Sequence, residues 1–332
     1  MPPERSPGLR CRALAPPAEA TLRARRLFHP KRGWFRRLER RVSHVLSRHV
    51  YPHVPFLHFP YERILRRQLT VAEADISVRG LEPPFDGLRL LLVTDVHTGP
   101  FISRRGFAEI VDRIDRLERD LIVLGGDLAT SRVRDFTDYA EIYTRLRAPL
   151  GVFGVLGNHD HFTDDPPRLA REIVAAGIRL LQNELVVLDR DGARLTLAGI
   201  DDLLFGAPDL DAALRGAPRG VPVVLLSHHP DVLFEAAERG VSLVLSGHTH
   251  AGQIRVPGLP VIVRMSQYHL DDGRYRCVEA ADGTAASGAP DAGTTPQVTT
   301  ELVVSRGLGA VGLPMRIACP PEVVLLRLRS SP

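Results

Sequence analysis

The 332-residue sequence lacks several features that would restrict its function. It contains no run of ~20 consecutive apolar residues, the length a helix needs to cross a bilayer, so we predict no transmembrane helix. Its three cysteines (Cys11, Cys277 and Cys319) are far apart and include no Cys-x-x-Cys pair, which disfavours a disulfide framework and a structural zinc site. Its single lysine, Lys31, lies in no glycine-rich phosphate loop, and there is no Gly-x-Ser-x-Gly elbow. The sequence therefore gives no support for nucleotide-driven phosphoryl transfer or serine chemistry.

Acidic residues are scarce near the N-terminus. Residues 1–70 hold sixteen Lys and Arg against four acidic residues, a net charge of +12, whereas the whole chain has a net charge of only +4. The remaining residues hold 27 basic and 35 acidic side chains and carry a net charge of −8. An acidic body is a poor general surface for nucleic acid.

Three regions follow from this composition. We predict a disordered Pro/Arg-rich N-terminus over 1–30, a basic amphipathic extension over 31–68 and one α/β domain over 69–330. Within 34–50, apolar residues including Trp34 and Phe35 recur at helical spacing, and arginines occupy the other face. Such a helix is typical of membrane-surface binding, but a helix packed on the domain and a transit peptide remain alternatives.

Apolar runs and helical patterns alternate through the middle of the domain. The apolar runs are 88–94, 121–125, 151–157, 194–200, 222–228 and 242–248, and the helical patterns lie near 103–119, 135–147, 166–176 and 231–239. This alternation predicts largely parallel, buried strands covered by helices. Past residue 260 the segments "VIVR", "RYRCV", "ELVVS" and "EVVLLRLR" predict antiparallel strands, and the Gly/Ala/Thr/Pro-rich segment 281–297 predicts a flexible hairpin insertion.

Five of the predicted strands end in polar side chains able to bind metals. These side chains are Asp95 and His97, then Asp127, then Asn158, His159 and Asp160, then His228 and His229, and finally His248 and His250. One such strand end would be an ordinary turn, but ligand sites of open α/β sheets gather at the carboxyl ends of the strands. Glycines at 99, 125, 126, 157 and 247 flank the same ends, where the backbone must turn sharply or approach a ligand.

The chemistry of this set can be derived from its donor atoms. Carboxylates, an amide and imidazoles without a thiolate suit Mn, Fe or Zn better than Ca or a structural Zn. There are enough donors for two ions if one carboxylate bridges them. Two divalent ions clamp the attacking and leaving oxygens at phosphorus and lower the pKa of a shared water toward ~7.

The motifs "DVH", "GGD", "GNHD", "SHHPD" and "GHTH" stand in the order found in calcineurin-like metallophosphoesterases, which the chain resembles over about residues 85–328. The resemblance implies two mixed β-sheets flanked by helices in an α/β/β/α sandwich. It also implies a hydrolase with two divalent metal ions (Mn, Fe or Zn). "SGHTHAGQ" together with "SRGLG…LPMR…PPEV" is similar to a branch of bacterial membrane-associated phosphodiesterases and UDP-2,3-diacylglucosamine pyrophosphatases.

The family pattern also implies roles for individual positions. Asp95, His97 and His250 would hold one metal, Asn158, His228 and His248 the second, with Asp127 bridging both. His159 would act as an acid on the leaving group or stabilise a phosphoryl oxygen, and Asp160 would orient it. Relatives often have Gly where this chain has Ala251, a change that we expect to be tolerated if no positive φ is needed there.

Further residues have weaker support. His229, Arg306 and Arg316 are candidate substrate contacts. Asp201 and Asp202 either support the ligands or start a turn. The function that we expect is hydrolysis of a phosphodiester or pyrophosphate bond in a small-molecule or lipid-linked substrate.

Two alternatives remain open: a catalytically silent membrane-associated scaffold, and a nuclease tethered by the basic N-terminus. We expect a cytoplasmic protein. The other option is a peripheral protein on the inner face of the membrane, which it would contact through residues 34–50. We do not expect nucleic acid to be its partner.

Overall fold

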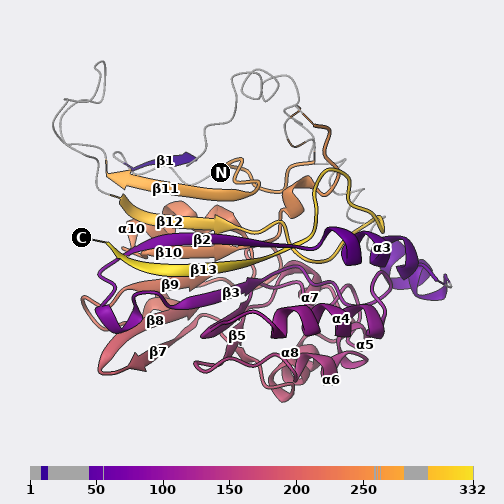
Figure 1. Cartoon of the computed structure of the whole chain (residues 1–332), viewed down its shortest axis with the longest axis horizontal. Helices are drawn as coiled ribbons and strands as arrows, with labels where there is room; N and C mark the ends of the chain where they lie inside the picture. The colour runs from indigo at the N-terminus through magenta and orange to yellow at the C-terminus, as the bar shows by residue number, and fades with distance from the viewer. Residues whose placement is uncertain are drawn as a thin grey trace.

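The structure is a computed structural model that describes residues 9–13, 45–54, 56–257, 259, 261, 263–279 and 298–331. Its strands form two mixed sheets that lie face to face (Figure 1). In order, the six-stranded sheet contains β2 (Thr70–Arg79), β13 (Glu322–Ser331), β3 (Arg89–Val93), β4 (Leu121–Leu124), β5 (Val152–Gly154) and β6 (Arg179–Leu180). The seven-stranded sheet contains β1 (Leu9–Ala13), β11 (Gly273–Glu279), β12 (Val298–Val304), β10 (Leu243–Ser246), β9 (Val223–Leu226), β8 (Ala193–Gly199) and β7 (Glu184–Arg190).

Helices cover the outer face of each sheet. They are α3 (His58–Gln68), α4 (Arg104–Asp115), α5 (Arg134–Thr137), α6 (Ala140–Tyr143), α7 (Asn158–His161), α8 (Pro166–Ala175), α9 (Leu210–Leu214) and α10 (Leu233–Glu238). Two of the longer helices, α4 and α8, begin at side-chain caps: Ser103 accepts a hydrogen bond from the Gly106 N–H, and Asp165 accepts one from the Arg168 N–H. In the part of the chain that the structure describes, no helix is both long enough and apolar enough to cross a bilayer.

The alternation of side chains along the strands creates three apolar layers. In β3, Leu90 and Leu92 join the core between the two sheets, whereas Leu91 faces the helices beside the six-stranded sheet. On the other side, Leu225 and Val244 pack with residues of α9 and α10. The α/β/β/α sandwich that the family resemblance implied is confirmed.

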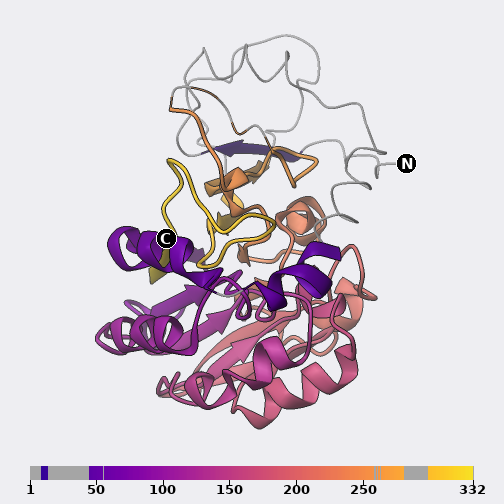
Figure 2. The same cartoon turned by 90° about the vertical axis from the view of Figure 1, so that its right-hand side faces the viewer.

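Parallel strands bring both sheets to one end of the molecule. β3, β4, β5 and β6 are parallel neighbours, and so are β8, β9, β10 and β12. The arrowheads of β3 and β12 point to the right-hand end in Figure 1, which faces the viewer in Figure 2. The loops that follow these strands therefore meet at that end.

Some local predictions were wrong. The pattern near 135–147 forms two short helices, α5 and α6, and "VIVR" belongs to no strand among its described residues. The last strands are not simply antiparallel: β12 pairs parallel with β10, and β13 pairs parallel with β2 but antiparallel with β3. The sequence pattern could not show this, because pairing between distant segments is set by the tertiary fold.

Several predictions fall mostly on residues outside the described part. Within 1–30, where we expected disorder, Leu9–Ala13 form β1 and pair with β11, and the other residues lie outside the described ranges. The helix expected over 34–50 is described only from Val45 onward, as a helical turn at Leu46–Val50. The insertion 281–297 is also outside, between the antiparallel strands β11 and β12.

Cysteine pairing differs from our expectation. Cys277 of β11 is disulfide-bonded, and Cys11 is its backbone partner across the β1–β11 ladder. Cys319 is free and buried. Sequence distance was therefore a poor guide, because the sheet brings together positions that are far apart in the chain.

Candidate metal centre

The polar side chains at the five strand ends converge. Asp127, which follows β4, lies at the middle of the set: its Oδ2 is 3.5 Å from Nε2 of His97 and 3.2 Å from Nε2 of His228. His97 follows β3 of the six-stranded sheet, and His228 follows β9 of the seven-stranded sheet. One carboxylate thus contacts imidazoles supplied by both sheets.

Asp95, His97 and His250 form a first cluster beside Asp127. Their potential ligand atoms lie within 4.8 Å of one another. Nε2 of His97 is 3.1 Å from Nε2 of His250, which in turn is 3.3 Å from Oδ1 of Asp95. All three side chains are buried. This is the group to which the family resemblance assigned one metal.

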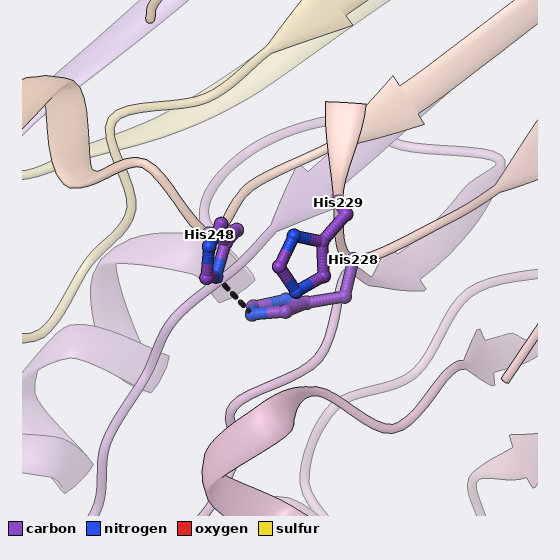
Figure 3. Close-up of side chains that lie close together, drawn as sticks. All are labelled: His228, His229 and His248. Atoms are coloured by element: carbon purple, nitrogen blue, oxygen red, sulfur yellow. Dashed lines mark hydrogen bonds between the residues drawn. The ribbon is translucent and has the colours of Figure 1, made fainter. Parts of the chain in front are cut away.

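Asn158, His228 and His248 form a second cluster on the other side of Asp127. Nε2 of His228 is 3.2 Å from Oδ1 of Asn158. The same nitrogen is 3.3 Å from Nδ1 of His248 (Figure 3). Nδ1 of His228 lies 2.8 Å from the carbonyl oxygen of Gly125 and donates to it. That hydrogen bond turns Nε2 of His228 toward Asp127 and Asn158, and this nitrogen binds a cation once it has given up its proton.

The backbone at these positions is strained. Five residues of the two clusters adopt a positive φ: Asp95 (51°), His97 (48°), Asp127 (54°), His248 (68°) and His250 (48°). This conformation is uncommon for residues other than glycine and persists only where the surrounding structure enforces it, often at functional sites. Ala251 also has a positive φ of 49°. We expected alanine in place of glycine to be tolerated only without a positive φ, so alanine costs stability at this position.

Two glycines allow the carboxylates to be this close to the backbone. A Cβ at Gly157 would lie 2.3 Å from Oδ1 of Asp127, and one at Gly247 would lie 2.2 Å from Oδ2 of Asp95. Neither distance is physically possible, so both positions require glycine. We predicted a sharp turn or a close approach to a ligand at these glycines, and the structure shows a close approach to the carboxylates of Asp127 and Asp95.

Burial shapes the charge of the site. It raises the pKa of Asp95 to about 6 and lowers the pKa of His97 to about 3. Burial also opposes the charged form of His228, but the nearby carboxylates, Asp127 foremost, outweigh it and raise the pKa of His228 to about 10. Conversely, His228 and His159 overcome the effect of burial on Asp127 and hold its pKa well below the usual range. The buried carboxylates and imidazoles of the site therefore control one another's charge.

The donor set fits a pair of divalent metal ions. Imidazole nitrogens, carboxylate oxygens and one amide oxygen suit Mn, Fe or Zn. Ring nitrogens of His97 and His250 face each other at 3.1 Å, and buried carboxylates lie next to both clusters. An arrangement in which lone pairs and negative charges converge is the one that a bound cation stabilises.

His159 lies next to both clusters but is not one of the seven proposed metal ligands. Its backbone N–H donates to Oδ1 of Asp127 at 2.7 Å, and its Nδ1 lies 2.7 Å from the carbonyl oxygen of Thr130. Its ring meets that of His97 edge-on, with centroids 4.7 Å apart. It is partly exposed, whereas the seven proposed ligands are buried. His159 is thus the residue of this group that solvent or a substrate reaches.

The role expected for Asp160 needs correction. We predicted that it orients His159, but its two carboxylate oxygens accept hydrogen bonds from the backbone N–H groups of Ala129 and Gly157, both at 2.9 Å. The carbonyl of Thr130 orients the His159 ring instead. Asp160 therefore fixes the loop after β4 to the start of α7.

The candidate substrate residues have protein partners of their own. His229 is buried, with its Nε2 3.1 Å from Asp202 and its ring against that of His248. Arg306 pairs with Glu322, and Arg316 is buried behind His250. None of the three is an exposed group of the kind that we expected at a substrate contact.

A known protein family matches the part of the chain that contains most of this site. Residues 88–252, from the start of β3 to the loop after β10, match the sequence model of the calcineurin-like phosphoesterases. The chain belongs to the calcineurin-like metallophosphoesterase family. Its buried His/Asp clusters are consistent with the two-metal site of the family.

Relatives of this metallophosphoesterase include vertebrate and bacterial proteins. It is 32% identical over 273 residues to the Danio rerio "Transmembrane protein with metallophosphoesterase domain", a match covering 79% of this chain and 57% of the relative. It is 28% identical over 278 residues to the "Uncharacterized metallophosphoesterase YkuE" of Bacillus subtilis, covering 82% and 90%. The chain thus spans little more than half the length of the Danio rerio protein.

Among solved structures, the metallophosphoesterase is similar to a 5'-nucleotidase precursor from Thermus thermophilus. The sequence identity is 16%, the TM-score is 0.35, and the match covers 65% of this chain and 54% of that chain.

Sequence reasoning missed the residues that support the metallophosphoesterase site from outside the motifs. Thr130 contributes only a carbonyl group, which leaves no trace in the residue type. Gly309 donates its N–H to the carbonyl of Asp95 at 2.6 Å, and Tyr61 donates to the carbonyl of Leu308. The "SRGLG" segment was noticed as a motif, but its contact with Asp95 was not predictable from its position in the chain.

Proposed function

We propose that this metallophosphoesterase uses two divalent ions to hydrolyse a phosphodiester or pyrophosphate bond. The observation that carries the proposal is the position of Asp127, whose Oδ2 lies 3.5 Å from Nε2 of His97 and 3.2 Å from Nε2 of His228. Those nitrogens belong to different clusters, so this carboxylate is placed to bridge two ions. A bridged pair suits in-line displacement at phosphorus.

Each cluster holds one ion in this proposal. Asp95, His97 and His250 hold the first ion. Asn158, His228 and His248 hold the second, and Asp127 is shared. Manganese is our first choice, with iron or zinc as alternatives, because the donors are oxygen and imidazole nitrogen without a thiolate. When bound, the two ions would neutralise charge on the phosphoryl group and make water nucleophilic near neutral pH.

His159 is the proposed acid for the leaving group. Its Nδ1–H is held by the carbonyl of Thr130, so Nε2 is the ring nitrogen left for a phosphoryl or leaving-group oxygen. Because the His159 N–H also donates to Asp127, the same carboxylate that joins the clusters fixes the backbone of the acid. We propose that His159 donates a proton or a hydrogen bond as the bond to phosphorus breaks.

The substrate is proposed to be lipid-linked or nucleotide-linked. The acidic body, the basic N-terminal extension and the resemblance of "SGHTHAGQ" and "SRGLG" to the diacylglucosamine pyrophosphatase branch support this choice. The same features support a place in the cytoplasm or on the inner face of the membrane. A silent scaffold is the weaker alternative, because all seven ligand positions and His159 are present.

The proposal is tested by hydrolysis of matched aryl phosphomonoester and phosphodiester substrates, with manganese or with a chelator. We expect manganese-dependent cleavage of the diester, and a loss of about 10²–10⁴-fold in His159→Ala with both ions retained. His53→Ala, which removes an exposed histidine of a short helical turn, is the control. A protein that holds two ions yet cleaves neither these esters nor a panel of natural pyrophosphates is a scaffold. Preferential binding of duplex DNA over anionic vesicles would instead favour the tethered nuclease.

A further inference from the structure

Exposed apolar side chains are unevenly distributed over the surface. Among the described residues, most of the exposed large apolar side chains lie in three segments: 45–59, 256–263 and 313–317. The most exposed are Phe56 (78%) and Phe59 (63%), and Leu313 and Ile317 are each about half exposed. Single exposed apolar residues are normal, but a contiguous group marks an interaction surface. We call the exposed apolar residues of these three segments the apolar rim.

Hydrogen bonds join the three segments into one surface. The Tyr51 hydroxyl donates to the carbonyl of Gly312, which ties the first segment to the third. The N–H of Arg255 donates to the carbonyl of Ile317 at 2.9 Å, and the N–H of Ile317 donates to the carbonyl of Gln253 at 3.1 Å. These hydrogen bonds bring the three segments together even though they are far apart in the sequence.

The apolar rim adjoins the metal centre. Its second segment follows His250 within the same loop, and its third contains Arg316, whose Nη2 lies 3.0 Å from Nδ1 of His250. Figure 2 shows these loops, in orange and yellow, on the end of the molecule toward which the strands of the site run, next to the indigo helical segment. A molecule bound on the rim is thus next to the first cluster.

A second apolar group lies near His159. The ring centroids of Phe162 and His159 are 5.6 Å apart, and those of Phe162 and Phe205 are 4.1 Å apart. Phe205 and its neighbour Leu204 are exposed. Apolar surface therefore lies near both the first cluster and the acid. That pattern fits a molecule with a phosphate in the site and apolar chains outside it.

Positively charged residues near the rim favour an anionic lipid surface over an apolar protein as its partner. Arg63 and Arg67 are exposed on α3, the helix that carries Phe59. In the sequence, residues 31–44 directly precede the first segment of the rim and hold six basic residues and only Glu39 as an acid. Apolar side chains flanked by cationic ones match an interface of acyl chains and anionic headgroups.

We propose that the apolar rim docks on an anionic membrane and that the substrate is an amphiphile with its phosphate at the metal centre. The choice of substrate rests on the proposed function, whereas the docking surface does not. Docking delivers the phosphate of a lipid to the strand ends without removing its chains from the bilayer.

The test is cosedimentation of the full-length protein with vesicles of phosphatidylcholine alone or mixed with phosphatidylglycerol. We expect binding to the mixed vesicles, weaker in 0.5 M salt as screening of surface charge requires. Binding should be at least ~10-fold weaker in Phe56→Ser/Phe59→Ser and in Leu313→Ser/Ile317→Ser, since exposed apolar area supports interfacial binding. Val174→Ser removes an equally exposed apolar side chain from α8, outside the rim, and should bind like the wild type.

The proposal would be overturned if the wild-type protein bound neither vesicle type. It would also be overturned if the two double variants bound like the wild type. Light scattering adds a further check: a dimer lost in the paired variants, with vesicle binding unchanged, assigns the rim to a second copy of this chain and also overturns it. Hydrolysis of the water-soluble aryl diester by the wild type is measured separately. Vesicle binding without that hydrolysis refutes the proposed function and leaves the docking surface standing.

Discussion

Arg316 lies directly behind His250. Its Nη2 is 3.0 Å from Nδ1 of His250 and donates to the carbonyl of Arg306 at 2.8 Å, while its Nε donates to the carbonyl of Gly309 at 2.8 Å. Both side chains are buried. The guanidinium group therefore fixes the histidine ring of the first cluster to the C-terminal segment, and the substrate contact expected from the sequence is replaced by a supporting role.

Replacing Arg316 with Gln should weaken one of the two metal sites. Arg316 fixes the place of the His250 ring through its bonds to the carbonyls of Arg306 and Gly309. Residues that position a ligand typically change metal affinity by about 10–100-fold, so we expect a loss of that size for one manganese ion and little change for the other. Isothermal titration of metal-free protein measures both. Arg255→Gln is the control, because Arg255 pairs with Asp272 in a partly exposed ion pair. Two unchanged affinities in Arg316→Gln would refute the supporting role.

Replacing Asp160 with Asn should act on stability. The carboxylate is buried and accepts two backbone hydrogen bonds, so the variant should lose about 1–3 kcal/mol of unfolding free energy. Urea unfolding of the metal-free protein measures this loss. Asp165→Asn, at the exposed cap of α8, should cost about 1 kcal/mol or less. If Asp160→Asn kept full stability and lost turnover, Asp160 would be acting through His159 after all.

A methyl group at Gly157 should disrupt the shared ligand. The added Cβ would lie 2.3 Å from Oδ1 of Asp127 and 2.5 Å from its backbone nitrogen, so Asp127 must move. Since Asp127 serves both clusters, Gly157→Ala should reduce bound manganese at both sites, as measured by elemental analysis after dialysis. Gly154→Ala on β5, where the nearest atom would be 3.3 Å away, should retain both ions. Retention of two ions in Gly157→Ala would argue against a shared carboxylate.

The His161–Asp201 pair should make stability depend on pH. Nε2 of His161 lies 2.7 Å from Oδ1 of Asp201. Although burial opposes both charged forms, the pairing raises the pKa of His161 above 6.5 and lowers the pKa of Asp201 below 3.8. The histidine contribution is complete below pH 6.5 and is lost as pH rises through the folded pKa. The aspartate contribution is complete above pH 3.8 and is lost as pH falls through the lowered pKa.

Asp201→Asn should therefore cost most between these two pH values, about 1–2 kcal/mol near pH 5.5, and less at pH 8.5. Urea unfolding of wild type and variant at both pH values gives the difference. A cost that grows from pH 5.5 to pH 8.5 would show that the ion pair is not its source.

Local sequence patterns predicted buried strands covered by helices and the convergence of the strand ends, whereas the two-sheet sandwich was implied by the family resemblance. Buried apolar runs that alternate with helices define the layers, and the polar residues after each run follow from the chain itself. Gly157 and Gly247 were readable for the same reason. The contact between Arg316 and His250, 66 positions apart, was not readable, because only the folded loops bring the two together. Thr130 acts through its carbonyl group, which every residue has, so no residue pattern could identify it.

Anomalous scattering at the manganese edge, from crystals grown with excess manganese, tests the central claim most directly. Asp127 joins the two clusters, so two peaks should lie about 3.5–4 Å apart with its carboxylate between them. The first peak should be bound by Asp95, His97 and His250, and the second by Asn158, His228 and His248. A single peak, or two peaks that do not share Asp127, would contradict a bridged pair and with it the proposed hydrolysis.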